Sequence, residues 1–109
     1  MVRGDTAIII PVYNEEAVIV DVIRSVLKKF SCVICVNDGS KDGSSRAISS
    51  TSAYLIEHPI NMGQGAALQT GIEFARQLKK IKYFVTFDAD GQHRIEDVLT
   101  MLKQLEKSE

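Results

Sequence analysis

The 109-residue sequence contains no tryptophan, two prolines and two cysteines, and its charges nearly balance, with 13 Lys and Arg against 14 Asp and Glu. A net charge of -1 gives no electric field that would favour nucleic acid binding. No apolar run approaches the roughly 20 residues of a membrane span, and the N-terminus lacks the basic and apolar segments of a signal peptide. We therefore expect one cytoplasmic α/β domain with no membrane span in this chain.

The two cysteines, Cys32 and Cys35, have the spacing of zinc-knuckle or redox pairs, but the sequence contains no second pair. They fall in a strand pattern, in which residues three apart point to opposite faces. We expect two reduced, buried thiols, with neither a disulfide nor a shared metal.

Four short apolar runs alternate with four stretches of helical periodicity. The runs are β-branched or aromatic and nearly continuous, which is typical of strands covered on both faces. Strands are predicted over residues 7–10, 32–36, 53–56 and 83–87, and helices over 18–27, about 43–50, about 65–78 and 95–106. Repeated β–α units predict an open, mostly parallel sheet with alternating helices and right-handed crossovers.

The helices carry further signals. Asn14 is placed to cap the first helix, with Glu15 and Glu16 in its first turn. The expected core faces are Ala67, Gly71, Phe74, Ala75 and Leu78 on the third helix and Val98, Leu102 and Leu105 on the last.

Polar residues follow the first, second and fourth predicted strands, at the carboxyl ends where open parallel sheets bind ligands. Asp38 could accept a hydrogen bond from a base N–H or a ribose hydroxyl, although Asn37 and Asp38 could also bond their own backbone in a turn. Glu15 is equally consistent with a helix-dipole role. Pro11 and Tyr13 predict a stiff turn whose ring packs either on a base or over the core.

After the third predicted strand, HPINMGQGAA places two glycines before a helix, a junction that can bring backbone N–H groups close to an anion. The dinucleotide fingerprint follows the first strand and needs a third glycine, so NAD and FAD are rejected. His58 and His93 have no partner acid or nucleophile at motif spacing, which favours solvated or structural roles.

The stretch FDADGQH places Asp88 and Asp90 one residue apart at the end of an apolar strand. If the strand continues, they share a face, where two carboxylates repel unless a cation or proton lies between them. Mg²⁺ or Mn²⁺ fits such oxygen ligands, and Gln92 offers a third oxygen. The alternatives are a structural turn, or a phosphatase of the haloacid dehalogenase type in which Asp88 attacks phosphorus and Asp90 is the general acid. That phosphatase motif belongs on a first strand, and here three β–α units precede it.

Four segments, IIIPVYNEE, VNDGSKDGS, NMGQGAALQTGIEFA and FDADGQH, together resemble the N-terminal half of a family 2 glycosyltransferase of the GT-A fold, a group that includes dolichol- and polyprenyl-phosphate sugar transferases. The resemblance implies a Rossmann-like nucleotide-binding half with strand order 3-2-1-4 and a UDP- or GDP-linked sugar donor. It implies the following sites: nucleoside contacts at Pro11, Tyr13 and Glu15, the base at Asp38, the ribose or metal at Asp88, and Mg²⁺ or Mn²⁺ on the diphosphate at Asp90 with Gln92.

The resemblance also implies transfer of the sugar with inversion to an acceptor such as a polyprenyl phosphate or a glycan of the cell envelope. In the family the acceptor site, and the catalytic base where one is used, lie downstream of the Asp-x-Asp segment, and this chain stops nineteen residues after Asp90. We therefore expect residues 1–109 to be a truncated donor-binding half, inactive alone, from a protein at the cytoplasmic face of a membrane. The alternative is a nucleotide- and metal-binding half-domain without turnover. Truncation would leave YFVTF as an exposed apolar edge that pairs with a second copy.

Overall fold

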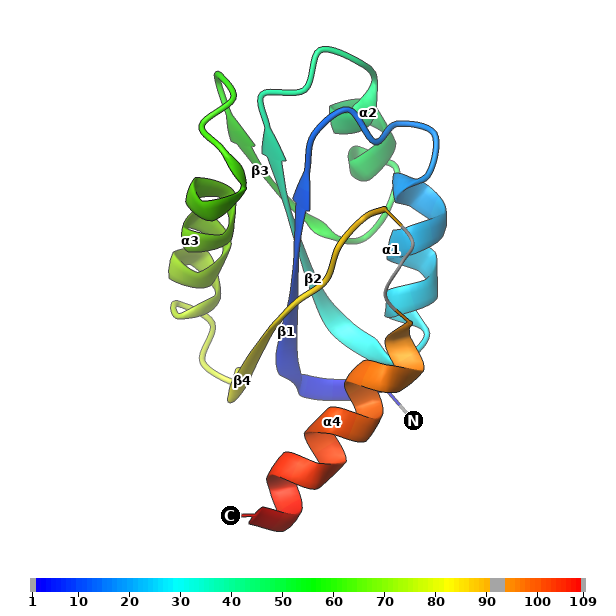
Figure 1. Ribbon diagram of the computed structural model, residues 1–109, viewed down its shortest axis with the longest axis vertical. Helices are drawn as coiled ribbons and strands as arrows, with labels where there is room; N and C mark the ends of the chain where they lie inside the picture. The colour runs from blue at the N-terminus through cyan, green and yellow to red at the C-terminus, as the bar shows by residue number, and fades with distance from the viewer. Residues whose placement is uncertain (1, 91–93, 109) are drawn as a thin grey trace.

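The structure, a computed structural model, describes residues 2–90 and 94–108 as a four-stranded parallel sheet with helices between the strands. The strand order is β3-β2-β1-β4, so the predicted fold class and strand order are confirmed. Figure 1 shows α3 on one face of the sheet and α1 and α2 on the other. The strands are β1 (Arg3–Val12), β2 (Phe30–Asp38), β3 (Tyr54–His58) and β4 (Tyr83–Thr86), and the helices are α1 (Ile19–Leu27), α2 (Ser44–Ser49), α3 (Gln64–Ala75) and α4 (Ile95–Ser108).

The strands end at different residues from those predicted, and the differences affect the candidate site. β2 continues through Asp38, so this residue ends a strand where the sequence suggested a turn. β3 is shifted toward the C-terminus, and His58 is its last residue. β4 ends at Thr86, so Asp88 and Asp90 follow the strand and do not continue it. The assumption that a strand carries both carboxylates is therefore wrong.

The start of α1 also differs from the prediction, and Asn14 does not cap it. The helix begins at Ile19, with Asp21 in its first turn, and the residue that precedes it makes no side-chain cap. Asn14 has a φ of 54°, and its side chain accepts a hydrogen bond from the backbone N–H of Lys41 at 2.9 Å. A contact with a distant loop therefore replaces the local cap, and Glu15 precedes the helix.

The two faces of the sheet carry two separate apolar clusters. The larger cluster joins Ile8 and Ile10 of β1 to residues such as Ile23 of α1, Ile48 of α2 and Leu102 of α4. The smaller cluster contains Ala7, Ile9, Cys32, Ile34 and Val36 from the sheet and Ala67 and Ala75 from α3. The predicted core face of α3 is confirmed at Ala67, Gly71 and Ala75, with Phe74 partly buried at its margin. Leu78 is partly buried too, but it lies beyond the end of α3.

The approach of α3 to the sheet is close because it carries a glycine at the contact. A Cβ atom on Gly71 would lie 2.5 Å from Cγ2 of Ile9 and 3.3 Å from Cγ2 of Val36. Carbon atoms do not pack at 2.5 Å, so a larger residue would push the helix away from the sheet.

The two cysteines are free and buried, as predicted. Cys32 belongs to the smaller cluster and Cys35 to the larger, so their side chains lie on opposite faces of β2. Burial raises the pKa of the Cys35 thiol to about 12, which keeps it protonated at neutral pH.

The last helix, α4, extends past the end of the sheet (Figure 1). It buries Val98 and Leu102, but Leu105 is 45% exposed, so the prediction of Leu105 as a core residue is wrong. Arg3 links β1 to the far part of α4 through an ion pair of 3.1 Å with Glu106. Among the described helices, none is long and apolar enough to cross a membrane.

β4 lies at one end of the described sheet, where it pairs with β1. Phe84 is 43% exposed, whereas Val85 is buried beneath the helices of the larger cluster. The predicted apolar edge is therefore exposed on the α3 face of the sheet and covered on the opposite face.

Candidate functional site

A cavity of about 400 Å³ opens at the carboxyl ends of β1 and β2 and beside the segment that follows β4. The first turn of α3 closes another side of it. Ligand pockets of small molecules have about this volume, roughly 300–1,000 Å³. The cavity is lined by Pro11, Val12, Tyr13, Glu15, Asp38, Asn61, Gly63, Gln64, Ala67, Asp88, Ala89 and Asp90.

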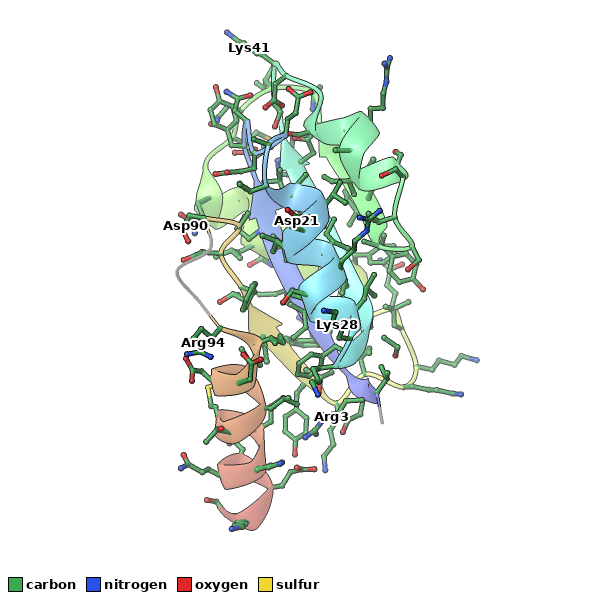
Figure 2. The ribbon with its side chains drawn as sticks, turned by 90° about the vertical axis from the view of Figure 1, so that its right-hand side faces the viewer. Arg3, Asp21, Lys28, Lys41, Asp90 and Arg94 are labelled. Atoms are coloured by element: carbon green, nitrogen blue, oxygen red, sulfur yellow. The ribbon has the colours of Figure 1, made fainter. Side chains whose placement is uncertain are left out.

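The predicted site residues that the structure describes all line this one cavity. They are Pro11, Tyr13, Glu15, Asp38, Asp88 and Asp90. Figure 2 shows Asp90 at the side of the molecule, above Arg94, with Lys41 at the upper end and Arg3 toward the opposite end. Gln92 and His93 lie outside the described residues.

The β1–α1 loop, which carries Tyr13 and Glu15, is supported by the loop after β2. The backbone N–H of Asn14 donates to the hydroxyl of Ser40 at 2.9 Å. In return, the Asn14 side chain accepts from the Lys41 N–H. These two hydrogen bonds hold the backbone of Asn14 in the left-handed conformation, which asparagine adopts more readily than most residues.

The next two residues of the loop are held in the same way. Glu15 donates its backbone N–H to the hydroxyl of Ser44 at 3.0 Å, and Glu16 donates to the carboxylate of Asp42 at 3.2 Å. Hydrogen bonds from Ser44 and Glu16 lower the pKa of Asp42 and keep it an acceptor. Because α1 begins at Ile19, the helix-dipole role considered for Glu15 does not apply, and its side chain lines the cavity.

Asp38 connects the end of β2 to the loop that precedes α3. Its Oδ1 accepts from the backbone N–H of Met62, and its Oδ2 accepts from the N–H of Gly63, both at 2.9 Å. Burial opposes ionisation of Asp38, but hydrogen bonds from His58, Met62 and Gly63 outweigh it and lower the pKa of this carboxyl below its ordinary value. The turn interpretation is therefore wrong for Asp38, which bonds a distant loop.

Asn37 also does not bond its own backbone as the turn interpretation predicted, because both of its partners are side chains. Its side-chain oxygen accepts from the hydroxyl of Ser40 in the same turn, while its amide donates to Glu57 of β3 at 3.2 Å.

His58 has the acidic partner that its sequence neighbourhood does not reveal. Its Nδ1 lies 2.8 Å from Oδ1 of Asp38, and its Nε2 lies 2.8 Å from the hydroxyl of Thr70 on α3. A structural role is confirmed, and the partner acid lies 20 residues away in the sequence, which is outside motif spacing. The missing signal is strand register, because Asp38 and His58 are paired residues of β2 and β3.

In the glycine-containing segment before α3, the backbone N–H of one glycine is already bonded within the protein. Gly63 has a φ of 99°, and its N–H donates to Asp38 and to the side chain of Asn61. One donor of this helix start therefore positions a carboxylate that lines the cavity.

The cavity is strongly acidic. Glu15, Asp38, Asp88 and Asp90 line it, and its described lining contains neither lysine nor arginine. The amide nitrogen of Gln64 lies 3.5 Å from Oδ1 of Asp88, so polar contact reaches this carboxylate from α3. A phosphate group would be repelled here unless a cation accompanied it.

Asp88 and Asp90 provide two carboxylates for such a cation. No group of three or more His, Cys, Asp or Glu that could hold a metal occurs within residues 2–90 and 94–108. Mg²⁺ commonly binds through one or two carboxylates and completes its shell with substrate phosphates and water. The residues present therefore fit a divalent cation that arrives with a phosphorylated ligand.

Comparison with known proteins assigns the family. The profile described as glycosyl transferase family 2 matches residues 7–109, nearly the whole chain. The chain belongs to glycosyl transferase family 2. The expectation of a glycosyltransferase sequence is thus confirmed at the level of the family, and the phosphatase alternative is withdrawn.

Several relatives of this family 2 chain are known. An uncharacterised protein of Methanocaldococcus jannaschii is 36% identical over 104 residues, which cover 90% of this chain and 45% of that protein. The UDP-N-acetylglucosamine–dolichyl-phosphate N-acetylglucosaminyltransferase of Methanococcus voltae is 31% identical, covering 90% of this chain and 46% of that enzyme. The undecaprenyl-phosphate 4-deoxy-4-formamido-L-arabinose transferase of Shewanella sediminis is 29% identical, and the match covers 93% of this chain and 33% of that enzyme. The chain spans less than half the length of these relatives.

Proposed function

We propose that this chain forms the donor-binding half of a glycosyltransferase that binds a nucleoside-diphosphate sugar with Mg²⁺ or Mn²⁺. The observation that carries the proposal is the convergence of the family 2 motifs on one acidic cavity, with Asp38 on one side and Asp88 and Asp90 on another. Family membership and the charge of the cavity point to the same ligand, an anion bound with a cation.

The proposed roles follow from the chemistry of each side chain. Asp38 accepts a hydrogen bond from the nucleobase, and the ring of Tyr13, which is 43% exposed, packs against the base together with Pro11. Glu15 completes this nucleoside contact. Asp88 binds the ribose or the cation, and Asp90 binds the cation together with Gln92.

A bound divalent cation would act as a Lewis acid that offsets the charge on the departing nucleoside diphosphate. The chain's own contribution is to hold the donor so that the acceptor attacks the sugar from the face opposite the diphosphate, which inverts the anomeric centre. We propose a polyprenyl phosphate as the acceptor, because the named relatives act with dolichyl and undecaprenyl phosphate. A glycan is the alternative acceptor, and no residue here is assigned as the catalytic base.

Titration of the purified 109-residue chain with UDP, GDP and dTDP, with and without Mn²⁺, tests the donor site. We expect Mn²⁺-dependent binding of at least one nucleotide, and we expect Asp90→Ala to abolish it because the cation loses a carboxylate. Asp21→Ala on α1 is the matched control, since it removes an exposed aspartate outside the cavity. Absence of binding by all three nucleotides would contradict the proposal.

The runner-up is a half-domain that binds nucleotide and metal without turnover. Both possibilities predict the same binding, so sugar transfer separates them. Measurable transfer of a labelled sugar from a bound donor by this 109-residue chain would refute the half-domain alternative, whereas binding without transfer is expected of these 109 residues under both possibilities.

We also propose that the edge of β4 pairs with a second copy of the chain. Phe84 exposes an apolar ring on β4, the strand at one end of the described sheet, and an apolar edge strand favours addition of another strand. Light scattering should detect a dimer that the substitution Phe84→Lys weakens. A chain that remains monomeric at high concentration would contradict this proposal.

A further inference from the structure

His58 joins three elements and contacts Asp38, which lines the cavity. It ends β3, and its side chain is 9% exposed between Asp38 of β2 and Thr70 of α3. Both ring nitrogens are within 2.8 Å of a partner oxygen. A buried side chain so fully engaged cannot turn without breaking two hydrogen bonds.

The direction of the first of these hydrogen bonds is fixed. The pKa of Asp38 is lowered, so at neutral pH its carboxylate can only accept, and the Nδ1–H of His58 must donate to it. In a neutral ring, Nε2 accepts from the Thr70 hydroxyl, and in a protonated ring Nε2 donates to it. In both states Nδ1–H holds Oδ1 of Asp38.

The remaining capacity of Asp38 is small. A carboxylate offers about four acceptor positions, two on each oxygen. On Oδ1 the donors are His58 and the Met62 N–H, and on Oδ2 one position is taken by the Gly63 N–H. One acceptor position on Oδ2 is left for a ligand in the cavity that Asp38 lines.

We propose that His58 is a positioning residue for nucleobase selection, which holds Asp38 so that one carboxylate oxygen selects bases with a ring N–H. This inference rests on the proposed donor site. Uracil and guanine present a ring N–H at their pairing edge, whereas cytosine presents a ring nitrogen with a lone pair. A fixed acceptor therefore favours UDP or GDP over CDP, because a lone pair facing a carboxylate leaves both acceptors unpaired.

Two substitutions of His58 distinguish the contribution of Nδ1 from that of Nε2. The amide of His58→Asn can replace Nδ1 and keep a donor on Asp38, whereas the longer His58→Gln places its amide near the position of Nε2 and keeps the contact with Thr70. Both remove the ring, so a purely structural role predicts similar losses. Val98→Ala on α4, buried and outside the cavity, serves as a control for lost stability alone.

The measurement is the ratio of UDP or GDP affinity to CDP affinity, determined by calorimetry with Mn²⁺ alongside thermal unfolding of each variant. We expect His58→Gln to lower this ratio roughly tenfold or more, as loss of a charged hydrogen-bond partner does. His58→Asn and Val98→Ala should keep the ratio of the unsubstituted chain. An unchanged ratio in His58→Gln, or an equal loss in both His58 variants, overturns the inference.

Spectroscopy of the unsubstituted chain covers the case in which a His58 variant does not fold. Long-range ¹H–¹⁵N spectra, recorded with diamagnetic Mg²⁺, should show Nδ1 of His58 protonated, with a proton resonance that UDP shifts and CDP does not. An unprotonated Nδ1, or equal shifts with both nucleotides, overturns the inference. Failure of the chain to bind any nucleotide instead refutes the proposed function itself, and the role of His58 falls with it.

Discussion

On the face covered by α1, α2 and α4, the sheet packs against large aliphatic side chains such as Ile23 and Leu102, whereas on the α3 face it meets Ala67, Gly71 and Ala75. The first face gains its stability from the apolar area that it buries. The second buries less and depends on close approach of the helix, together with the polar link from Asp38 through His58 to Thr70. Different substitutions and different solution conditions should therefore destabilise the two faces.

The larger cluster should show the largest loss when a single side chain is shortened. Ile23 is fully buried, and Ile23→Ala should lower the free energy of unfolding by about 2–5 kcal/mol because it leaves a cavity. Chemical denaturation measures the change. Val22→Ala, one position away and only partly buried, should cost clearly less. Equal costs for the two variants would contradict the assignment of Ile23 to the centre of this cluster.

The α3 face should instead be sensitive to a side chain made larger. Gly71→Ala should cost about 1–3 kcal/mol of unfolding free energy, because the new methyl overlaps Cγ2 of Ile9. Gly65→Ala in the same helix is the control, since a Cβ there meets nothing within 4 Å and alanine favours helix by up to about 1 kcal/mol. If both variants gain stability, α3 does not approach the sheet as closely as described.

Acid should weaken the polar link of the α3 face. The pKa of Asp38 is below its ordinary value of 3.8, so unfolding takes up protons, and the stability it provides above that pH is lost as the pH falls through the lower folded pKa. Asp38→Asn should therefore be less stable than the unsubstituted chain at pH 7, with a gap that narrows below pH 4. Thermal unfolding across pH measures this gap, and a constant gap would argue against an ionised Asp38.

The smallest effect on stability is expected near the C-terminal end of α4, on the face of the larger cluster. Glu106→Gln removes the ion pair with Arg3, which is partly exposed, and should cost between about 0 and 1 kcal/mol of unfolding free energy. Raising the salt concentration should reduce the difference between the variant and the unsubstituted chain, as measured by chemical denaturation. A loss comparable to that of Ile23→Ala would mean that this contact fixes α4 to a degree the geometry does not suggest.

The sequence predicts the parallel sheet and the gathering of site residues for one reason, whereas the strand order is implied by the resemblance to family 2 glycosyltransferases. Alternation of β and α elements forces a parallel sheet, which brings the residues after successive strands, such as Tyr13, Asp38 and Asp88, to one edge. The prediction therefore depends on topology and tolerates errors of a few residues at the strand ends.

Other features depend on contacts that periodicity does not encode. Asn14 resembles a helix cap in the sequence, but its partners, Ser40 and Lys41, lie 26 and 27 residues away. The pairing of Asp38 with His58 requires the register of β2 and β3. Leu105 continues the apolar stripe of α4, yet the sheet ends before that stripe does.

The four hydrogen bonds that join residues 14–16 to the loop after β2 and to the first residue of α2 have a thermodynamic consequence for ligand binding. The backbone freedom of this segment is given up when the chain folds, at a cost of about 1–2 kcal/mol for each ordered residue. Under the proposed function, a nucleoside that enters the cavity does not have to order these residues again, so less of its contact energy is spent on ordering the protein. Substitution of Ser40 or Ser44 should accordingly weaken nucleoside binding through entropy, although neither side chain lines the cavity.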